Sequence, residues 1–157
     1  MKIIFTKISP THHSLELLRD DGSCEYTEIE TKTFMPHDLI HYAFESEAGL
    51  QNSFWGLLDK DKTLAELNDK QFLTDLIQSN SEIAQTEMIT GILHGLAKGE
   101  ATVEQTMAGV ENAFSAKSIP VPDYLTRDFL TKLKERFRQL LGKWSAMKKG
   151  EKMELEF

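Results

Sequence analysis

The chain has 157 residues, of which 40% are hydrophobic and 27% charged, as in a soluble globular domain, and no apolar run is long enough to cross a membrane. Its net charge of −7 argues against nonspecific binding to nucleic acid, which depends on cationic side chains that neutralise phosphates. The single cysteine, Cys24, excludes an internal disulfide and a zinc site built from several cysteines.

The N-terminal segment, MKIIFTKISP, predicts a β-strand. Its apolar patch is too short for the core of a signal peptide, and no small-residue cleavage site follows it. Together with the lone cysteine, this pattern favours a cytoplasmic location and no membrane partner.

Two further strands are predicted before residue 30, because apolar residues alternate with polar ones in segments 14–17 and 24–27. Asp21-Gly22 between these segments is a strong hairpin signal, since a tight turn needs positive φ angles that Gly and Asp tolerate. We therefore expect an antiparallel meander in which Cys24 is a small core residue.

A helical period begins at Pro36, which suits the first position of a helix because its missing N–H would have no helical partner there. Asp38 follows near the positive end of the helix dipole, and Gly49 is a natural stop. Short helices are predicted in NSFWGLLDK and KTLAELND, and we assign Phe54 and Trp55 of the first to the core.

Three longer helices are predicted in the second half of the chain. One covers residues 81–99, with Ser81 as a cap and Gly99 as a stop, and the next covers 102–118 with Thr102 as a cap. After the break IPVP, a last helix is expected from Asp123 to about Leu141.

The end of the chain returns to the period of a strand. In KMELEF, the apolar side chains of Met153, Leu155 and Phe157 point to one face and the glutamates between them to the other. We expect this strand to join the N-terminal sheet. The sequence thus predicts a single α+β domain over residues 1–157, in which a helical layer covers one antiparallel sheet.

The helix from Pro36 carries two histidines, His37 and His41, on one flank of its apolar face. Residues four apart lie one turn apart, so both imidazoles can reach one ion, as in helical zinc sites. Glu45 is two turns, or about 12 Å, beyond His37 and lies toward solvent with Asp38. A third ligand must therefore come from another segment.

His94 is the strongest outside candidate for that ligand. It lies with Glu87 on the polar side of the helix predicted over residues 81–99, where Gly91 and Gly95 would allow another helix to approach closely. The adjacent residues His12 and His13 are weaker candidates, because neighbours in a strand point to opposite faces.

Three interpretations of His37 and His41 stay open. In the first, they are hydrogen-bonded structural residues, and Asp38, one turn before His41, accepts from an imidazole nitrogen. In the second, they are ligands of a divalent metal such as zinc. In the third, they form a metal-free acid/base site in which Asp38 or Glu45 raises the basicity of an imidazole. No glutamate directly follows the first histidine, so the metalloprotease motif is absent.

Local resemblances add to this pattern. HDLIH resembles the His-Asp-x-x-His element of the ubiquinone-biosynthesis accessory family, which implies zinc-binding histidines and a glutamate after eleven further residues, where this chain has Ser53. Three stretches, FMPHDLIHY, GLQNSFWGLL and KWSAM to MELEF, are similar to an uncharacterised family of short bacterial proteins. That resemblance implies a bacterial cytoplasmic protein and no residue roles.

The last predicted helix carries an apolar stripe. Its members are Leu130, Leu133, Phe137, Leu140 and Trp144. Residues 123–152 hold nine Lys or Arg and four Asp or Glu, a local balance of +5, so the other 127 residues carry −12. The stripe either covers the sheet or, through Leu133, Phe137 and Trp144, forms a surface for a homodimer or another protein partner.

Two functions follow from these features. The first is a non-enzymatic domain of a bacterial protein that binds a protein or a small ligand through its helices. The second is a metal-dependent enzyme, a hydrolase or lyase, in which His37 and His41 hold the ion and Glu45 or Asp38 orients a ligand or moves a proton.

Overall fold

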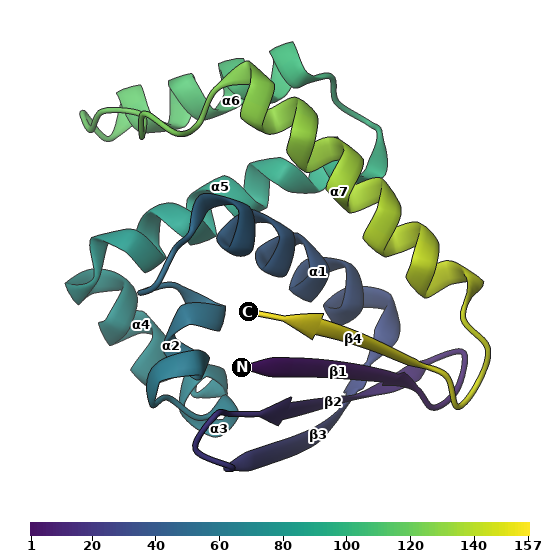
Figure 1. Cartoon of the computed structure of the whole chain (residues 1–157). Coiled ribbons are helices and arrows are strands. Elements are labelled where there is room, and N and C mark those ends of the chain that lie inside the picture. Colours follow the sequence, from purple (N-terminus) through teal and green to yellow (C-terminus); the bar gives the residue numbers. More distant parts are fainter.

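A four-stranded antiparallel sheet contains the first and the last strand of the chain (Figure 1). The computed structural model describes all 157 residues. The strands are β1 (Lys2–Lys7), β2 (His12–Leu18), β3 (Cys24–Glu30) and β4 (Lys152–Glu156), in the order β3-β2-β1-β4. The predicted meander is confirmed, with Gly22 at a φ of 86° in the turn between β2 and β3, and the C-terminal strand pairs with β1.

The register of the sheet brings its apolar residues to one face. Ile3 pairs with Leu17 and Leu155 on its two sides, and Phe5 pairs with Leu15 and Met153. All of these side chains are buried, because strand residues two apart share a face and the helices cover this one.

Seven helices follow or connect the strands. They are α1 (Thr31–Ala48), α2 (Phe54–Lys60), α3 (Leu64–Asn68), α4 (Lys70–Ser79), α5 (Ser81–Lys98), α6 (Val103–Ala116) and α7 (Arg127–Ala146). Helix α1 lies between the sheet and helices α5 and α7 (Figure 1). The α+β class with a helical layer on one sheet is therefore confirmed.

Helix α1 begins five residues earlier than the proline predicted. The Glu30 carboxylate accepts hydrogen bonds from the backbone N–H groups of Lys32 and Thr33, at 2.7 and 2.8 Å, and so caps the helix. Pro36 lies inside the helix, and Gly49 ends it at a φ of 67°, as expected. The helix therefore starts at the end of β3, where Glu30 caps it, and Pro36 is not its first residue.

Two other helix predictions were wrong. Helix α4 was not predicted, although Asp69 caps it by accepting from the Phe72 N–H at 2.8 Å. The last helix begins at Arg127, capped by Thr126, and continues to Ala146, so its predicted bounds of Asp123 and Leu141 were too early at both ends.

The side chain of Cys24 is exposed, so the prediction that it is a core residue was wrong. None of the helices combines the length and the apolar character that a membrane span needs.

Candidate metal site

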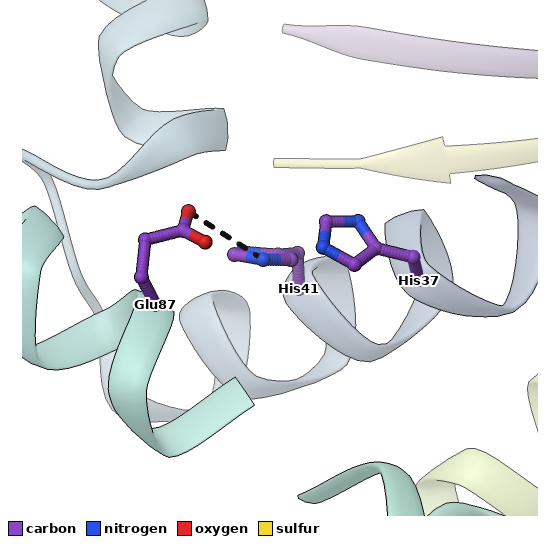
Figure 2. A group of neighbouring side chains, drawn as sticks. All are labelled: His37, His41 and Glu87. Carbon is purple, nitrogen blue, oxygen red and sulfur yellow. Dashed lines mark ion pairs between the residues drawn. The ribbon is translucent and has the colours of Figure 1, made fainter. Parts of the chain in front are cut away.

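Helices α1 and α5 bring three potential metal ligands together. His37 and His41 are one turn apart on α1, and Glu87 faces them from α5. Figure 2 shows the His41 ring between the Glu87 carboxylate and the His37 ring. One ligand atom from each residue lies within 4.8 Å of the other two, and His41 Nε2 is 3.7 Å from Glu87 Oε1.

His41 is the best-defined member of this group. Its side chain is buried, and its Nδ1 lies 2.9 Å from Glu45 Oε1. Its Nε2 is also buried but has no hydrogen-bond partner. A histidine that ligates a metal usually donates its other ring N–H to a carboxylate or carbonyl, which fixes the ring and its tautomer. Glu45 acts in this way on Nδ1 and leaves Nε2 directed at the cluster.

Glu45 is fully buried and firmly held, which corrects the expectation that it lies toward solvent. Its second oxygen accepts from the Ser53 hydroxyl at 2.7 Å and from the Trp55 backbone N–H at 2.8 Å. Such a carboxylate has no freedom to move toward an ion. Glu45 therefore orients His41, and the structure does not make it one of the three ligands.

Ser53 occupies the position where the resemblance to the His-Asp-x-x-His element expects a glutamate. Its hydroxyl reaches Glu45 and not the imidazoles. The ring centroid of the next residue, Phe54, lies 6.0 Å from that of His41, so the segment does return to the neighbourhood of the histidines. It supports the carboxylate behind His41 and supplies no ligand of its own.

The charge on His41 depends on opposing effects. Burial lowers the pKa of His41, but the hydrogen bond to Glu45 and the charges of Glu45, Glu87 and Asp38 outweigh it, so the pKa is raised. Without a metal, the site therefore favours an imidazolium ion. A metal must displace this proton, so its affinity is expected to rise with pH.

His37 and Asp38 lie on the more open side of the site. The His37 side chain is 44% exposed, and its ring centroid is 4.5 Å from that of His41. Asp38 is buried, and its Oδ1 lies 3.5 Å from His37 Nδ1. The imidazole nitrogen that Asp38 contacts therefore belongs to His37, whereas Glu45 is the partner of His41.

His94 comes close to the cluster without joining the group of three. Its ring centroid is 5.8 Å from that of His37, and burial together with the positive charges of His37, Lys98 and His41 lowers its pKa. Gly91 has open space beside it, and Gly95 meets only Ala101, so these glycines do not create the approach of α1.

Glu87 is the candidate ligand that sequence reasoning missed. The sequence placed it on the same side of its helix as His94, two turns away. Only the antiparallel packing of α5 on α1 sets Glu87 against His41 and His94 against His37. The seven-residue spacing of Glu87 and His94 places both on one face of α5. It indicates a shared site with His37 and His41 only when the packing of α5 on α1 is known.

The cluster fits a small divalent ion after a modest contraction. Zinc binds imidazole nitrogen at 2.0–2.1 Å and carboxylate oxygen at 2.0–2.2 Å, so ligand atoms around one tetrahedral ion are roughly 3.3–3.5 Å apart. The Glu87 side chain is 33% exposed and that of His37 is more exposed still, so both can adjust while His41 stays in place.

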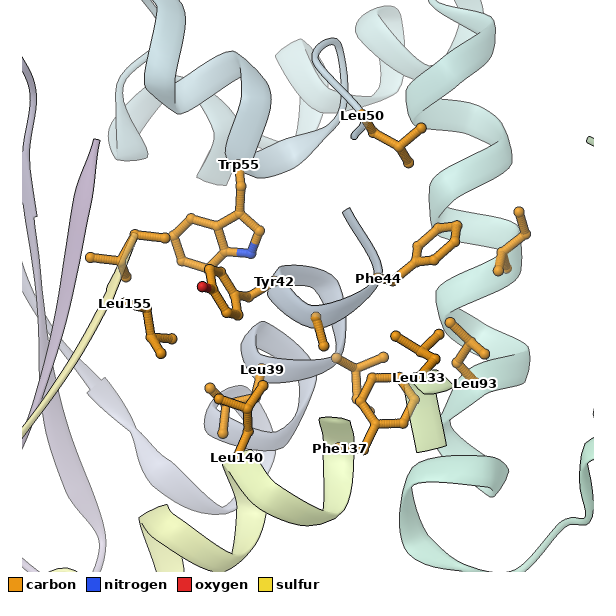
Figure 3. Packing of buried hydrophobic residues seen from close by; sticks show 14 of the residues in the cluster. Leu39, Tyr42, Phe44, Leu50, Trp55, Leu93, Leu133, Phe137, Leu140 and Leu155 are labelled. Atoms are coloured by element: carbon orange, nitrogen blue, oxygen red, sulfur yellow. The ribbon is translucent and has the colours of Figure 1, made fainter. Parts of the chain in front are cut away.

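The stripe on α7 is part of the core (Figure 3). Leu133, Phe137 and Trp144, which were the candidates for partner binding, are buried to 7% exposure or less. Leu133 and Phe137 lie between α1 and α5 in Figure 3. The stripe therefore packs within the chain and does not form an exposed surface for a partner.

No protein-family model matches the chain, and neither a curated protein nor a solved structure was found to be similar to it.

Proposed function

We propose that this protein binds one divalent transition metal, with zinc as the expected ion, through His37, His41 and Glu87. The observation that carries the proposal is the buried, unpartnered Nε2 of His41, whose other nitrogen is oriented by Glu45. A buried polar atom without a partner is costly and calls for an explanation, and a metal ion supplies one.

The ligand set favours a catalytic site over a structural one. Structural zinc sites are closed by four protein ligands, whereas catalytic sites use three, including the set of two histidines and one glutamate, and leave a position for water. The three residues here form that set. Bound zinc would lower the pKa of its water to about 7 and polarise a substrate carbonyl.

We therefore favour a metal-dependent hydrolase. Glu45 is the residue that positions His41, and Asp38 stands beside His37 at the edge of the site. The His94 ring lies next to that of His37, and we assign to it the exchange of a proton with a ligand of the ion. Non-enzymatic binding of a protein or small ligand is the second candidate, and the α7 stripe no longer supports its protein form because the stripe is buried.

The metal proposal is tested by calorimetric titration of chelator-treated protein with zinc. We expect one saturable site per chain in the wild type, strongly weakened binding in Glu87→Gln, and none in His41→Ala. His12→Ala is the matched control, because His12 is exposed on β2 away from the cluster. Equal zinc affinity in Glu87→Gln and the wild type would contradict the proposed ligand set.

The hydrolase proposal has a separate test. Zinc-loaded wild type and zinc-loaded His94→Ala are assayed with panels of esters, amides and phosphoesters. We expect turnover by the wild type that requires zinc and falls in the variant. Stoichiometric zinc binding without turnover of any panel member would favour the non-enzymatic candidate.

A further inference from the structure

A small cavity lies beside the histidine cluster, between strands β2 and β3 and the N-terminal ends of helices α1, α2 and α3. Its volume is about 260 Å³, somewhat below the range of about 300–1,000 Å³ that is usual for drug-sized ligands. The apolar part of its wall consists of Leu15, Ile29, Phe34, Phe54 and Leu64. Phe34 is 48% exposed and forms the outer part of this wall.

The charged residues of the wall are both acidic. They are Asp38 and Glu28, and no lysine or arginine lines the cavity. Glu28 is exposed at the rim, where it accepts from the Tyr26 hydroxyl at 2.9 Å. The cavity therefore combines an apolar wall with negative charge only.

Asp38 is the unusual member of this wall. Only 9% of the residue is exposed, yet its one hydrogen-bond contact is the long one, 3.5 Å, to His37 Nδ1. Buried carboxylates are normally paired or bound by several donors, because the loss of water is costly. The second oxygen of Asp38 has no protein donor and is accessible within the cavity wall.

The cavity and the metal ligands share their boundary. Asp38 lines the cavity and contacts His37, and Phe54 lines the cavity while its ring centroid is 6.0 Å from that of His41. A molecule in the cavity is therefore one residue away from both histidines. None of the three metal ligands lines the cavity itself, so the cavity can hold one group of a substrate that extends to the ion.

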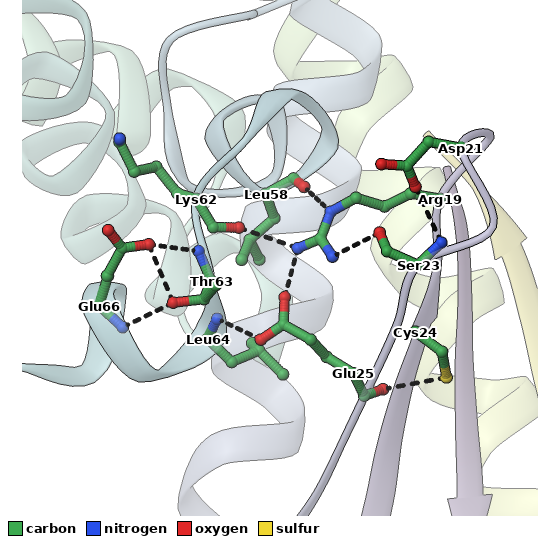
Figure 4. A network of polar contacts seen from close by, with 10 residues as sticks. All are labelled: Arg19, Asp21, Ser23, Cys24, Glu25, Leu58, Lys62, Thr63, Leu64 and Glu66. Atoms are coloured by element: carbon green, nitrogen blue, oxygen red, sulfur yellow. Dashed lines mark hydrogen bonds and ion pairs between the residues drawn. The ribbon is translucent and has the colours of Figure 1, made fainter.

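One part of the wall is held rigidly (Figure 4). The Glu25 carboxylate pairs with Arg19 and also accepts from the backbone N–H of Leu64 at 2.8 Å. Arg19 in turn donates to the carbonyl oxygens of Leu58 and Lys62, at 2.6 and 2.8 Å. This network fixes the start of α3 against the sheet, so Leu64 offers a preformed apolar surface.

We propose that this cavity binds a small apolar primary amine, with its ammonium group on Asp38 and its apolar group against Leu15, Phe54 and Leu64. An ammonium ion supplies the donors that Asp38 lacks, and the apolar wall accepts a hydrocarbon chain or ring of fragment size. Binding of the amine does not require the metal, whereas the role of the amine as one group of a larger, hydrolysable substrate rests on the proposed function.

The test uses phenethylammonium as the probe and follows its binding by NMR titration of chelator-treated protein. For so small a ligand we expect a dissociation constant on the order of 1 mM. Phenethyl alcohol and 3-phenylpropionate have similar apolar groups but carry no positive charge, and we expect each to bind at least about tenfold more weakly, because they lose the charge-assisted hydrogen bond.

Two variants locate the site. Asp38→Asn should weaken phenethylammonium binding about tenfold and leave the alcohol unaffected, and Thr27→Tyr should fill the cavity from β3 and weaken both probes. Asp61→Asn is the matched control, because Asp61 is exposed and outside the cavity wall. Equal binding of amine and alcohol, or unchanged amine binding in both cavity variants, would overturn the proposal.

A second arm separates this inference from the metal site. In protein loaded with paramagnetic Co²⁺, the protons of bound phenethylammonium should relax faster than in zinc-loaded protein. Amine binding without this enhancement, in protein shown to contain one Co²⁺, would overturn the role of the cavity as the substrate pocket. Failure to load Co²⁺ would instead count against the proposed metal site and leave the amine titration as the test of the cavity.

A peptide serves as a further probe of the cavity. Tighter binding of leucylglycylglycine than of phenethylammonium would assign the cavity to a peptide N-terminus and overturn the proposal of a small free amine.

Discussion

His41 and His13 are both buried histidines with an unpartnered Nε2, but their neighbours differ. His41 lies among Glu45, Glu87 and a second imidazole. His13 lies on β2 between the rings of Phe5 and Trp144, at centroid distances of 5.9 and 5.6 Å, and its Nδ1 lies 3.1 Å from the Thr31 hydroxyl.

This difference separates a chemical site from a packed core residue. Burial lowers the pKa of His13, and the charges of Asp38 and Glu30 offset this only in part, so the ring stays neutral. The acids around His41 outweigh burial and raise its pKa. An unpartnered nitrogen thus indicates a site only when other ligands converge on it, as they do at His41 and not at His13.

The largest expected effect comes from replacing each histidine by leucine. His41→Leu leaves the buried Glu45 without its cationic partner and should lower the free energy of unfolding by about 3–5 kcal/mol. In His13→Leu, the leucine side chain is similar in size and packs against the same rings, so the free energy of unfolding should fall by less than about 1.5 kcal/mol. Urea denaturation at pH 7 measures both values. Equal losses in the two variants would remove the distinction.

Zinc should stabilise the folded chain only through the His41 region. With free zinc at a hundredfold excess over the dissociation constant, binding raises the free energy of unfolding by about 2.7 kcal/mol. We expect this gain in the wild type and in His13→Leu, and a much smaller gain in Glu87→Gln. Thermal unfolding with and without zinc measures it, and an undiminished gain in Glu87→Gln would argue against the ligand set.

The hydrogen bond from Ser53 to Glu45, the residue that orients His41, can be tested with a smaller substitution. Ser53→Ala removes one buried donor to the Glu45 carboxylate and should cost about 1.5–3 kcal/mol, because bonds to charged groups are stronger than neutral ones. Ser79→Ala is the control, since its exposed hydroxyl donates only to carbonyls of its own helix. A Ser53→Ala cost within 0.5 kcal/mol of the control, roughly the scatter of surface substitutions, would show that Glu45 is not held as described.

The two histidines should affect the pH dependence of stability with opposite signs. His13 has a lowered pKa, so the unfolded chain binds its proton more readily, and stability falls as pH drops below about 6.5. His41 has a raised pKa, so its contribution is fully present below about 6.5 and is lost as pH rises through the folded value.

Urea denaturation of chelator-treated protein from pH 5 to pH 8 measures these contributions. From pH 7 to pH 5, the wild type should lose more stability than His13→Leu. From pH 6.5 to pH 8, it should lose more than His41→Leu. Parallel pH profiles for the wild type and either variant would contradict the stated environment of that histidine.

The sequence predicted those parts of the fold that depend on local signals. The strand alternation, Asp21-Gly22, Gly49 and the cap at Thr102 all lie where they were expected. The N-caps Glu30, Asn80 and Thr126 were missed because several polar residues near a helix start can act as the cap. Which of them does so depends on how the preceding strand or loop enters the helix.

The candidate site was predicted in part. The turn spacing of His37 and His41 is local and could be read from the sequence, whereas Glu87 became visible only when α5 packed on α1. The burial of Glu45 also depended on a distant segment, because its partners Ser53 and Trp55 lie beyond the end of its helix. A helical wheel treats such a carboxylate as solvent-facing.

The most direct test of the metal site is a long-range ¹H–¹⁵N NMR spectrum of the histidine side chains, recorded before and after one equivalent of zinc. We predict that His41 Nε2 and one nitrogen of His37 shift to values of metal-bound imidazole, that His41 Nδ1 stays protonated toward Glu45, and that both nitrogens of His13 are unchanged. Unshifted His37 and His41 signals at saturating zinc, or a shift of His13 in their place, would contradict the account.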